Sequence, residues 1–87
     1  PSAGSRFLLD APVVAAGRHP ESEIFLDDVT VSRRHAEVKQ EGGAWWIVDL
    51  GSTNGVEVNG RRVDRAKLEH DDEIVLGTSQ LRFERGF

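Results

Sequence analysis

Apolar residues occur along the chain in short runs, and turn-forming residues separate one run from the next. In one run apolar and charged residues alternate, which places Ala36 and Val38 on the same face of an extended strand. The run Ala44–Leu50 is the most apolar, with Trp46 and Ile47 on opposite faces. We predict strands at Arg6–Leu9, Val13–Ala16, Glu23–Leu26, His35–Lys39, Ala44–Leu50, Glu73–Leu76 and Leu81–Phe87.

Dipeptides that favour positive φ mark the turns between these runs. Gly42-Gly43, Asn54-Gly55 and Asn59-Gly60 are of this kind, because glycine and asparagine both tolerate such backbone angles. Only Arg65–Glu69 has the composition of a helix, and it is too short to shape the fold. Closely spaced short strands with turns between them predict an all-β fold, an antiparallel sandwich or barrel.

The composition is that of one compact domain. The 87 residues contain no linker, repeat or low-complexity tract, so we predict a single domain over residues 1–87. The absence of cysteine excludes disulfides and thiolate metal sites, and it indicates a reducing, cytoplasmic compartment. No apolar run approaches the roughly 18 residues of a membrane span, so no membrane partner is expected.

The net charge of -4 argues against a nucleic-acid partner, because proteins that grip nucleic acid present a basic face to its phosphates. Several basic residues are instead gathered in two short clusters, Arg18-His19 and Arg33–His35, with acidic residues between them. A few arginines on an otherwise acidic surface indicate one small anion as the ligand.

Catalytic and metal-binding interpretations find little support. Ser32, His35 and Asp49 are the residue types of a hydrolytic triad, but no glycine-rich elbow surrounds the serine. The acidic pairs Asp27-Asp28 and Asp71-Asp72 lack the ligand spacing of a calcium loop, and the three histidines show no zinc pattern. We therefore expect neither an enzyme nor a bound metal or other cofactor.

We expect three loops to converge at one end of the sandwich. Arg18 follows a predicted strand, Ser32–His35 opens another, and Gly51–Gly55 follows a third. Their guanidinium, hydroxyl and backbone N–H groups suit a phosphoryl group, whose oxygens the planar arginine fork meets bidentately. The residues alone leave a second interpretation equally open, in which the arginines are solvated and Ser-Thr-Asn-Gly is only a turn.

Four linked motifs resemble the signature of the forkhead-associated (FHA) domain family in order and spacing. They are Gly17-Arg18, Ser32-Arg33-Arg34-His35, Gly51-Ser52-Thr53-Asn54-Gly55 and Val58-Asn59-Gly60, and the closing stretch Asp72–Gly77 with Leu81–Phe83 is also similar to the family's last two strands. The resemblance covers nearly the whole chain and implies an antiparallel, FHA-like β-sandwich whose loops bind a phosphothreonine. From Ala16 to Val38 the chain most resembles the small actinobacterial FHA regulators of the GarA and OdhI type.

The resemblance assigns ligand-binding roles to matching positions. It implies that Arg18 and Ser32 bind the phosphate directly and that Arg33 makes a further phosphate or peptide contact. Thr53 is expected to face the phosphothreonine. Asn54 is expected to hydrogen-bond the peptide backbone, which requires both a donor and an acceptor.

Other matching positions are implied to act in selectivity or support. Thr30 and Asn59 are the candidates for peptide selectivity, and Asn59 is also expected to tie two loops together. Gly17, His35 and Gly55 are expected to support the site without touching the ligand, with Gly55 permitting the turn.

The chain departs from the family pattern at two places. FHA domains usually carry a hydrophobic strand before the segment that begins here with Pro1, so the first strand of the fold is expected to be missing from this chain. An open sheet edge would invite a dimer or strand exchange. Asp71 stands where relatives commonly have glycine, and we expect it to adopt a positive φ.

The leading hypothesis is a non-catalytic module that binds phosphothreonine in partner proteins downstream of serine/threonine kinases. The resemblance to the actinobacterial regulators further implies control of metabolic enzymes. The alternative is a structural sandwich that binds partners through a sheet face independently of phosphate. A small hydrolase built on Ser32 and His35 is the third hypothesis.

Overall fold

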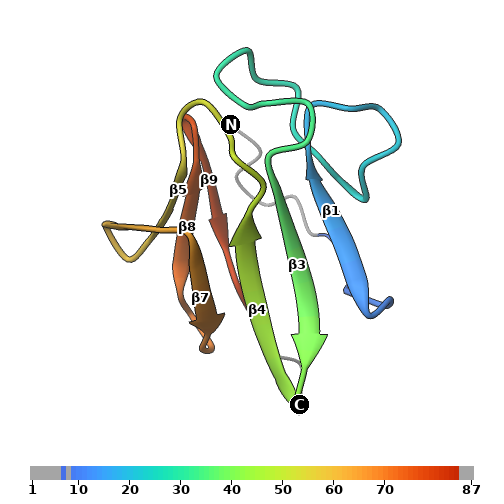
Figure 1. Ribbon diagram of the computed structural model, residues 1–87, viewed down its shortest axis with the longest axis vertical. Coiled ribbons are helices and arrows are strands. Elements are labelled where there is room, and N and C mark those ends of the chain that lie inside the picture. Colours follow the sequence, from blue (N-terminus) through green and yellow to red (C-terminus); the bar gives the residue numbers. More distant parts are fainter. Residues whose placement is uncertain (1–6, 8, 85–87) are drawn as a thin grey trace.

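The computed structural model describes residue 7 and residues 9–84, and this part of the chain consists of strands and turns (Figure 1). Its strands are β1 (Val13–Gly17), β2 (Ile24–Phe25), β3 (Ala36–Glu41), β4 (Ala44–Asp49), β5 (Val56–Val58), β6 (Arg61–Val63), β7 (Arg65–Leu68), β8 (Glu73–Leu76) and β9 (Ser79–Arg82). Among the described residues there is no helix at all, and hence none long and apolar enough to span a membrane.

The strands form two sheets, as the predicted β-sandwich requires (Figure 1). One sheet has the order β2-β1-β3-β4-β7, and the other has the order β6-β5-β8-β9. Neighbouring strands run antiparallel except β1 and β2, which pair in parallel through Ala16 with Ile24 and Gly17 with Phe25. The all-β sandwich is therefore confirmed, with one parallel pair that the sequence pattern does not predict.

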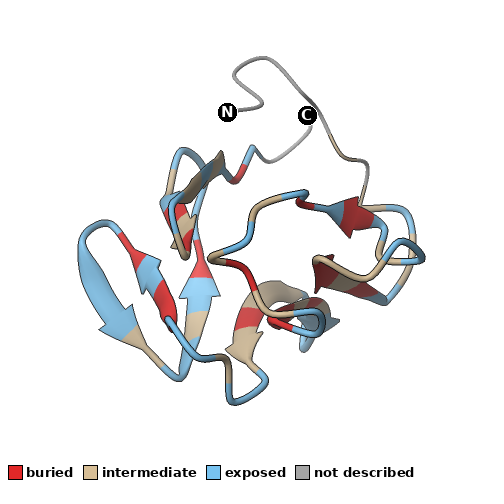
Figure 2. Ribbon diagram, turned by 90° about the horizontal axis from the view of Figure 1, so that it is seen from above, coloured by how far each residue is buried: buried red, intermediate tan, exposed pale blue. Residues whose placement is uncertain are grey.

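The core lies on the faces that the alternating residues turn inward, and buried positions alternate with more exposed ones along the strands (Figure 2). In the five-stranded sheet Val14 pairs with Val38 and Val38 pairs with Ile47, which gives one buried row across three strands. The second sheet contributes Val56, Val58, Ile74 and Leu76. Trp45 is partly buried and packs against this core. Trp46 lies on the outer face, where the guanidinium of Arg65 stacks over its ring at 4.4 Å. The predicted alternation of faces in β3 and β4 is confirmed.

Residues with positive φ close the predicted turns. Gly42 (φ 60°) and Gly43 (φ 78°) connect β3 to β4, and Asn59 (φ 52°) and Gly60 (φ 83°) connect β5 to β6. Two successive positive φ values match the right-handed twist of a hairpin, which is why these dipeptides stand there. Asp71 has a φ of 73°, as expected for the position where relatives commonly have glycine.

Three short strands lie where the sequence predicts no strand. Residues 65–69 have the composition of a helix, but 65–68 form β7, because Ala66 and Leu68 pair with β4 and pack on the core. β5 and β6 have three residues each, too few for an alternating pattern to be recognised. Pairing with longer neighbours therefore decides these strands.

The two ends of the chain differ from the prediction or lie outside the described residues. β9 covers Ser79–Arg82 and so begins two residues before the predicted strand Leu81–Phe87. Residues 85–87 of that predicted strand lie outside the described part of the chain. The predicted strand Arg6–Leu9 is also only partly described. Its described members, Phe7 and Leu9, belong to no strand but pack against the core.

The end of β1 approaches the β2–β3 loop so closely that only glycine fits there. A Cβ at Gly17 would collide with the carbonyl oxygen of Arg33 and would lie 3.0 Å from that of Ser32. The absent side chain allows main-chain bonds on both sides: the Gly17 carbonyl accepts the Leu26 N–H at 2.9 Å, and the Arg18 N–H donates to the Ser32 carbonyl at 3.0 Å. Gly17 thus joins the two loops that precede and follow β2.

We predict that Gly17→Ala lowers the free energy of unfolding by about 2–3 kcal/mol, because the added methyl must displace a main-chain carbonyl in a packed region. Urea denaturation followed by tryptophan fluorescence measures this loss. Gly42→Ala is the control, since its methyl would meet nothing within 4 Å and only the positive φ opposes it. A loss no larger than that of the control would contradict the steric argument.

Candidate functional site

Three loops meet at one end of the sandwich, at the upper end in Figure 1. They are the β1–β2 loop (residues 18–23), the β2–β3 loop (26–35) and the β4–β5 loop (50–55), and we refer to them together as the three-loop site. Main-chain bonds connect the first two, since the N–H groups of Arg18 and His19 donate to the carbonyls of Ser32 and Arg33 at 3.0 and 3.1 Å. The predicted convergence of the loops is therefore observed.

The guanidinium of Arg18 is held in one direction by its own loop neighbour. Its Nε donates to the carbonyl oxygen of Val31 at 3.0 Å. Its two Nη groups make no hydrogen bond or ion pair within residues 7 and 9–84, so both ends of the fork stay available. A fixed arginine with a free fork is suited to an anion that offers two oxygens.

The hydroxyl of Ser32 lies beside the turn of the β4–β5 loop. Its Oγ accepts the N–H of Thr53 at 3.2 Å across 21 positions of sequence. Because a serine hydroxyl both accepts and donates, this contact leaves the hydroxyl hydrogen free for a ligand. Arg18 and Ser32 are therefore joined through their main chains, while the Nη groups of Arg18 and the hydroxyl hydrogen of Ser32 remain available.

The remaining predicted ligand residues surround this pair. Arg33 and Thr53 are exposed, and neither side chain has a hydrogen bond or ion pair in the described part of the chain. Asn54 is exposed as well, and its Nδ2 donates to the carbonyl of Thr30 at 2.7 Å. That bond orients the amide and leaves its oxygen unused, so one donor and one acceptor still point outward.

His35 is fully buried and bridges two of the loops. Its Nδ1 accepts the Ser32 N–H at 3.0 Å, so the ring hydrogen resides on Nε2, which donates to the carbonyl of Gly55 at 2.7 Å. The main chain of His35 extends the link, because its carbonyl accepts the Leu50 N–H at 3.0 Å. Both ring nitrogens are spent on backbone groups, which makes the ring a brace between the β2–β3 and β4–β5 loops.

The β4–β5 loop is also fixed from within. The Ser52 N–H donates to Asp49 Oδ1 at 2.9 Å, and the Ser52 hydroxyl accepts the Gly55 N–H at 2.9 Å. Gly55 has a φ of 80°, a region that residues with a side chain rarely adopt. The turn that presents Thr53 and Asn54 is therefore fastened by its own hydrogen bonds.

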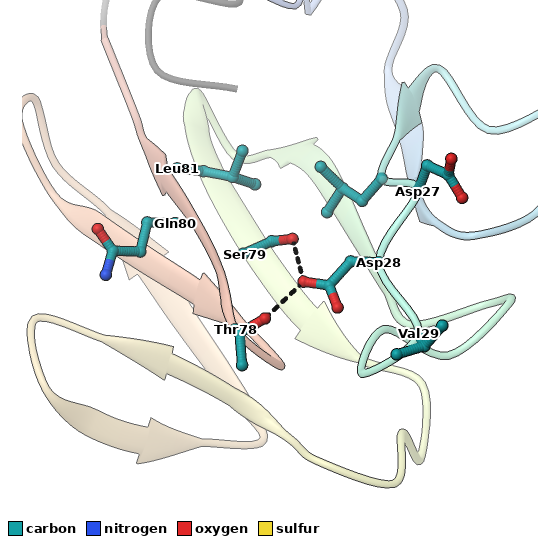
Figure 3. A pocket seen from close by; sticks show the side chains of 8 residues that line it. Asp27, Asp28, Val29, Thr78, Ser79, Gln80 and Leu81 are labelled. Carbon is teal, nitrogen blue, oxygen red and sulfur yellow. Dashed lines mark hydrogen bonds between the residues drawn. The ribbon is translucent and has the colours of Figure 1, made fainter. Parts of the chain in front are cut away.

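The carboxylate of Asp28, within the β2–β3 loop, joins this loop to the β8–β9 turn. Asp28 accepts hydrogen bonds from the N–H and hydroxyl of Thr30, at 2.9 and 2.6 Å, and from the hydroxyls of Thr78 and Ser79, at 2.7 and 2.8 Å. Figure 3 shows the bonds from Thr78 and Ser79, which come from the opposite sheet. The four donors lower the pKa of Asp28 well below its ordinary value, the Thr30 hydroxyl first and Thr78 next.

A pocket of about 780 Å³ opens next to this carboxylate (Figure 3). Its lining comes from the β2–β3 loop and from the β8–β9 region, namely Leu26, Asp27, Asp28, Val29, Thr78, Ser79, Gln80 and Leu81. Val29 is 90% exposed at its rim, an unusual position for a branched apolar side chain. The pocket adjoins Thr30, the residue predicted to act in peptide selectivity.

Asn59 is not brought to the three-loop site. It lies at the far end of β5 from Gly55, where its side chain pairs with the β7–β8 region. Its Nδ2 donates to Asp72 at 2.9 Å, and its Oδ1 accepts the Glu73 N–H at 3.0 Å. The side chain of Asn59 thus ties the β5–β6 turn to the β7–β8 turn, as expected. Both its nitrogen and its oxygen are used in these bonds.

The sequence does not single out Asp28, Thr78 or Ser79 as parts of the site. The spacing Asp28-Val29-Thr30 is a local signal, because an aspartate often bonds the N–H two residues onward. The contacts to Thr78 and Ser79 span 50 and 51 positions, and no local pattern announces them.

Within the described residues, no group of three or more His, Asp or Glu side chains is arranged to hold a metal ion.

Comparisons with known proteins agree with one another. The family model described as FHA domain matches residues 14–77. Over 86 residues the chain is 59% identical to the glycogen accumulation regulator GarA of Mycolicibacterium smegmatis and 54% identical to the oxoglutarate dehydrogenase inhibitor of Corynebacterium diphtheriae, in both cases over 99% of its own length. It covers 54% and 60% of those relatives, little more than half of each.

A solved structure has the same fold over almost the whole chain. It is described as "Structural and functional analysis of phosphothreonine-dependent FHA domain interactions". The two superpose with a TM-score of 0.91 at 33% sequence identity, covering 98% of this chain and 88% of that one.

We predict that His35→Phe lowers the free energy of unfolding by about 2–5 kcal/mol, because the Ser32 N–H and the Gly55 carbonyl both lose their partner. Urea denaturation measures the loss. His70→Phe is the control on an exposed histidine, whose contact with Asp71 at 3.5 Å lies at the surface, and it should shift stability by less than about 1 kcal/mol. Equal midpoints for parent and His35→Phe would show that the ring is no brace.

We predict that Asp28 stabilises the fold in a pH-dependent way. Because its pKa is lower in the folded state, its contribution is complete above the ordinary value of 3.8 and declines as the pH falls below that value, where the unfolded chain takes up the proton first. Thermal unfolding of the parent and Asp28→Asn should therefore differ most near neutral pH and converge in acid. Thr78→Val, which removes one donor, should show a weaker pH dependence, whereas a gap that is constant with pH would refute the prediction.

Proposed function

The chain belongs to the FHA domain family, and on that premise we propose that the three-loop site binds a phosphothreonine of a partner protein. The observation that carries this proposal is the pairing of Arg18 with Ser32. Their backbones are hydrogen-bonded at 3.0 Å, the guanidinium is oriented by Val31, and the serine hydroxyl keeps its hydrogen. Two side chains that can donate to an anion thus stand on residues whose main chains are bonded to each other.

A phosphorylated side chain suits these donors. It carries roughly −1.5 to −2 charges at neutral pH and offers three acceptor oxygens. The Nη groups of Arg18 and the Ser32 hydroxyl would take the phosphate oxygens, with Arg33 as a further cation at the edge. The site needs no reorganisation for this, because main-chain bonds and His35 already hold it.

The neighbouring residues would read the peptide around the phosphate. We assign Thr53 to the face of the phosphothreonine and Asn54 to the peptide backbone, through the amide groups that Thr30 leaves unused. Thr30 and the adjacent pocket are assigned to selectivity for flanking residues, whereas the internal bonds of Asn59 argue for a supporting role. Preference over phosphoserine would come from a niche for the γ-methyl, worth about 1–3 kcal/mol in a fitted pocket.

Supporting roles fall to residues that build the site without reaching the ligand. Gly17 admits the close approach of the β2–β3 loop, Gly55 supplies the positive φ of the β4–β5 loop, and His35 joins the two loops. The same bonds speak against a hydrolase. Neither ring nitrogen of His35 faces the Ser32 hydroxyl, and Asp49 is bonded to Ser52, so a non-catalytic module is proposed.

The proposal extends to the protein from which the domain comes. Two relatives are named as a glycogen accumulation regulator and as an oxoglutarate dehydrogenase inhibitor, and this chain matches about half of each. We propose that residues 1–87 form one FHA domain of a regulator that responds to serine/threonine kinases and acts on metabolic enzymes. A cytoplasmic location belongs to this proposal and rests on the absence of cysteine. A dimer or strand exchange at a sheet edge stays a prediction.

We predict that the domain binds a phosphothreonine peptide and rejects the unmodified peptide, with phosphoserine weaker than phosphothreonine. Fluorescence anisotropy with labelled peptides measures the dissociation constants. Arg18→Ala and Ser32→Ala should each weaken binding about 10- to 150-fold, the equivalent of about 1.5–3 kcal/mol for a hydrogen bond to a charged group.

Arg34→Ala is the matched control for charge, because Arg34 is exposed and stands one residue beyond Arg33 without an ion pair in the described part of the chain. It should weaken binding less than three-fold, an effect of long-range attraction alone. Equal affinity for phosphorylated and unmodified peptides would instead favour the alternative of a phosphate-independent interaction sandwich.

A further inference from the structure

The cationic side chains of the described residues divide into two groups. Lys39, Arg65, Lys67 and Arg82 each lie within 4 Å of a carboxylate, at distances of 2.7 to 3.9 Å. Arg18, Arg33, Arg34, Arg61 and Arg62 make no such ion pair within the described part of the chain. Arg18, Arg33 and Arg34 belong to the three-loop site. The two arginines of β6 do not, and the proposed function gives them no role.

Arg62 does not use the carboxylate that stands opposite it. In the register of β5 and β6, Arg62 faces Glu57, the arrangement in which a cross-strand ion pair would normally form. Their charged atoms nevertheless do not come within 4 Å. The guanidinium lies farther along the sheet, toward the end that carries the three-loop site.

The guanidinium of Arg62 occupies the space that a side chain at Gly55 would fill. A Cβ added at Gly55 would lie 2.5, 2.6 and 2.8 Å from Nε, Cζ and Nη2 of Arg62. Gly55 itself is held on both sides, because its N–H donates to the Ser52 hydroxyl and its carbonyl accepts from His35. Arg62 therefore rests against a hydrogen-bonded part of the β4–β5 loop, at the residue that follows Asn54.

We propose that Arg62 is a specificity residue that recognises an acidic side chain of the bound peptide, on the Asn54 side of the phosphothreonine. This inference rests on the proposed function, since it requires a peptide in the three-loop site. The exposed guanidinium of Arg62 is positioned by packing against Gly55 and makes no ion pair with Glu57. It can therefore bind a carboxylate of another molecule through its planar fork.

The experiment uses phosphothreonine peptides in which every flanking position is alanine, except one that carries Asp, Asn or Lys in turn. Affinities are measured by fluorescence anisotropy for the parent domain, Arg62→Gln, Arg62→Glu and the matched control Arg61→Gln. Arg61 lies on the same strand, next to the β5–β6 turn and away from Gly55.

We expect the parent to prefer Asp over Asn about two- to five-fold at one flanking position, the strength of an exposed ion pair. The preference should vanish in Arg62→Gln, turn into a preference for Lys in Arg62→Glu, and persist in Arg61→Gln. Higher salt should reduce it. Arg62→Gln and Arg61→Gln should bind the all-alanine phosphopeptide within about three-fold of the parent. Arg62→Glu should bind it more weakly than either, because it places a negative charge near the phosphate.

Three results would overturn the proposal: no position prefers Asp, the preference survives in Arg62→Gln, or Arg62→Gln weakens all peptides alike. The last would make Arg62 a packing support of Gly55. A failure of the proposed function is recognised separately, because the parent would then not distinguish the all-alanine phosphopeptide from its unmodified form.

Discussion

The imidazole of His35 joins two loops that lead into different sheets, and the geometry of the three-loop site depends on this one buried contact. The β2–β3 loop holds Ser32 and the β4–β5 loop holds Gly55, and each gives a backbone group to one ring nitrogen, at 3.0 and 2.7 Å. A fully buried polar ring is tolerated only when both nitrogens are paired, so the ring position and the loop separation determine each other. The Ser32 hydroxyl and the Thr53–Gly55 turn consequently have a fixed spacing before a ligand arrives.

Around this contact, main-chain bonds hold Arg18 beside Ser32 and leave their ligand-binding atoms free. Arg18 pairs with Ser32 through its main chain, which leaves its fork unspent, and Ser32 accepts one N–H while its hydroxyl hydrogen remains. The acidic residues nearby do not neutralise the arginines, because Asp28 is bonded to hydroxyls and Glu23 to the Ala15 N–H. A chain with a net charge of -4 can thus present one small cationic site.

Much of the fold could be predicted because its signals are local. Alternation in 35–39 and 44–50 marks two strands, and the dipeptides Gly42-Gly43 and Asn59-Gly60 mark two hairpin turns, all within a few residues. The structure confirms these four features. β5, β6 and β7 escape such patterns, since three or four residues acquire strand structure only by pairing with longer neighbours. The same limit hides Thr78 and Arg62, whose relevance arises from contacts with Asp28 and Gly55 that no spacing announces.

The sequence by itself determined the fold class, the family and the residue types of the site, because strand periodicity, turn chemistry and the four motifs are properties of neighbouring residues. Only the tertiary structure decided which of the candidates meet. It brought Arg18, Ser32, Thr53 and Asn54 to one end, placed Asn59 at the other end of β5, and put Arg62 against Gly55. The physical reason is that sheet order and loop packing set distances between distant residues, and these follow from the shared core and not from local preference.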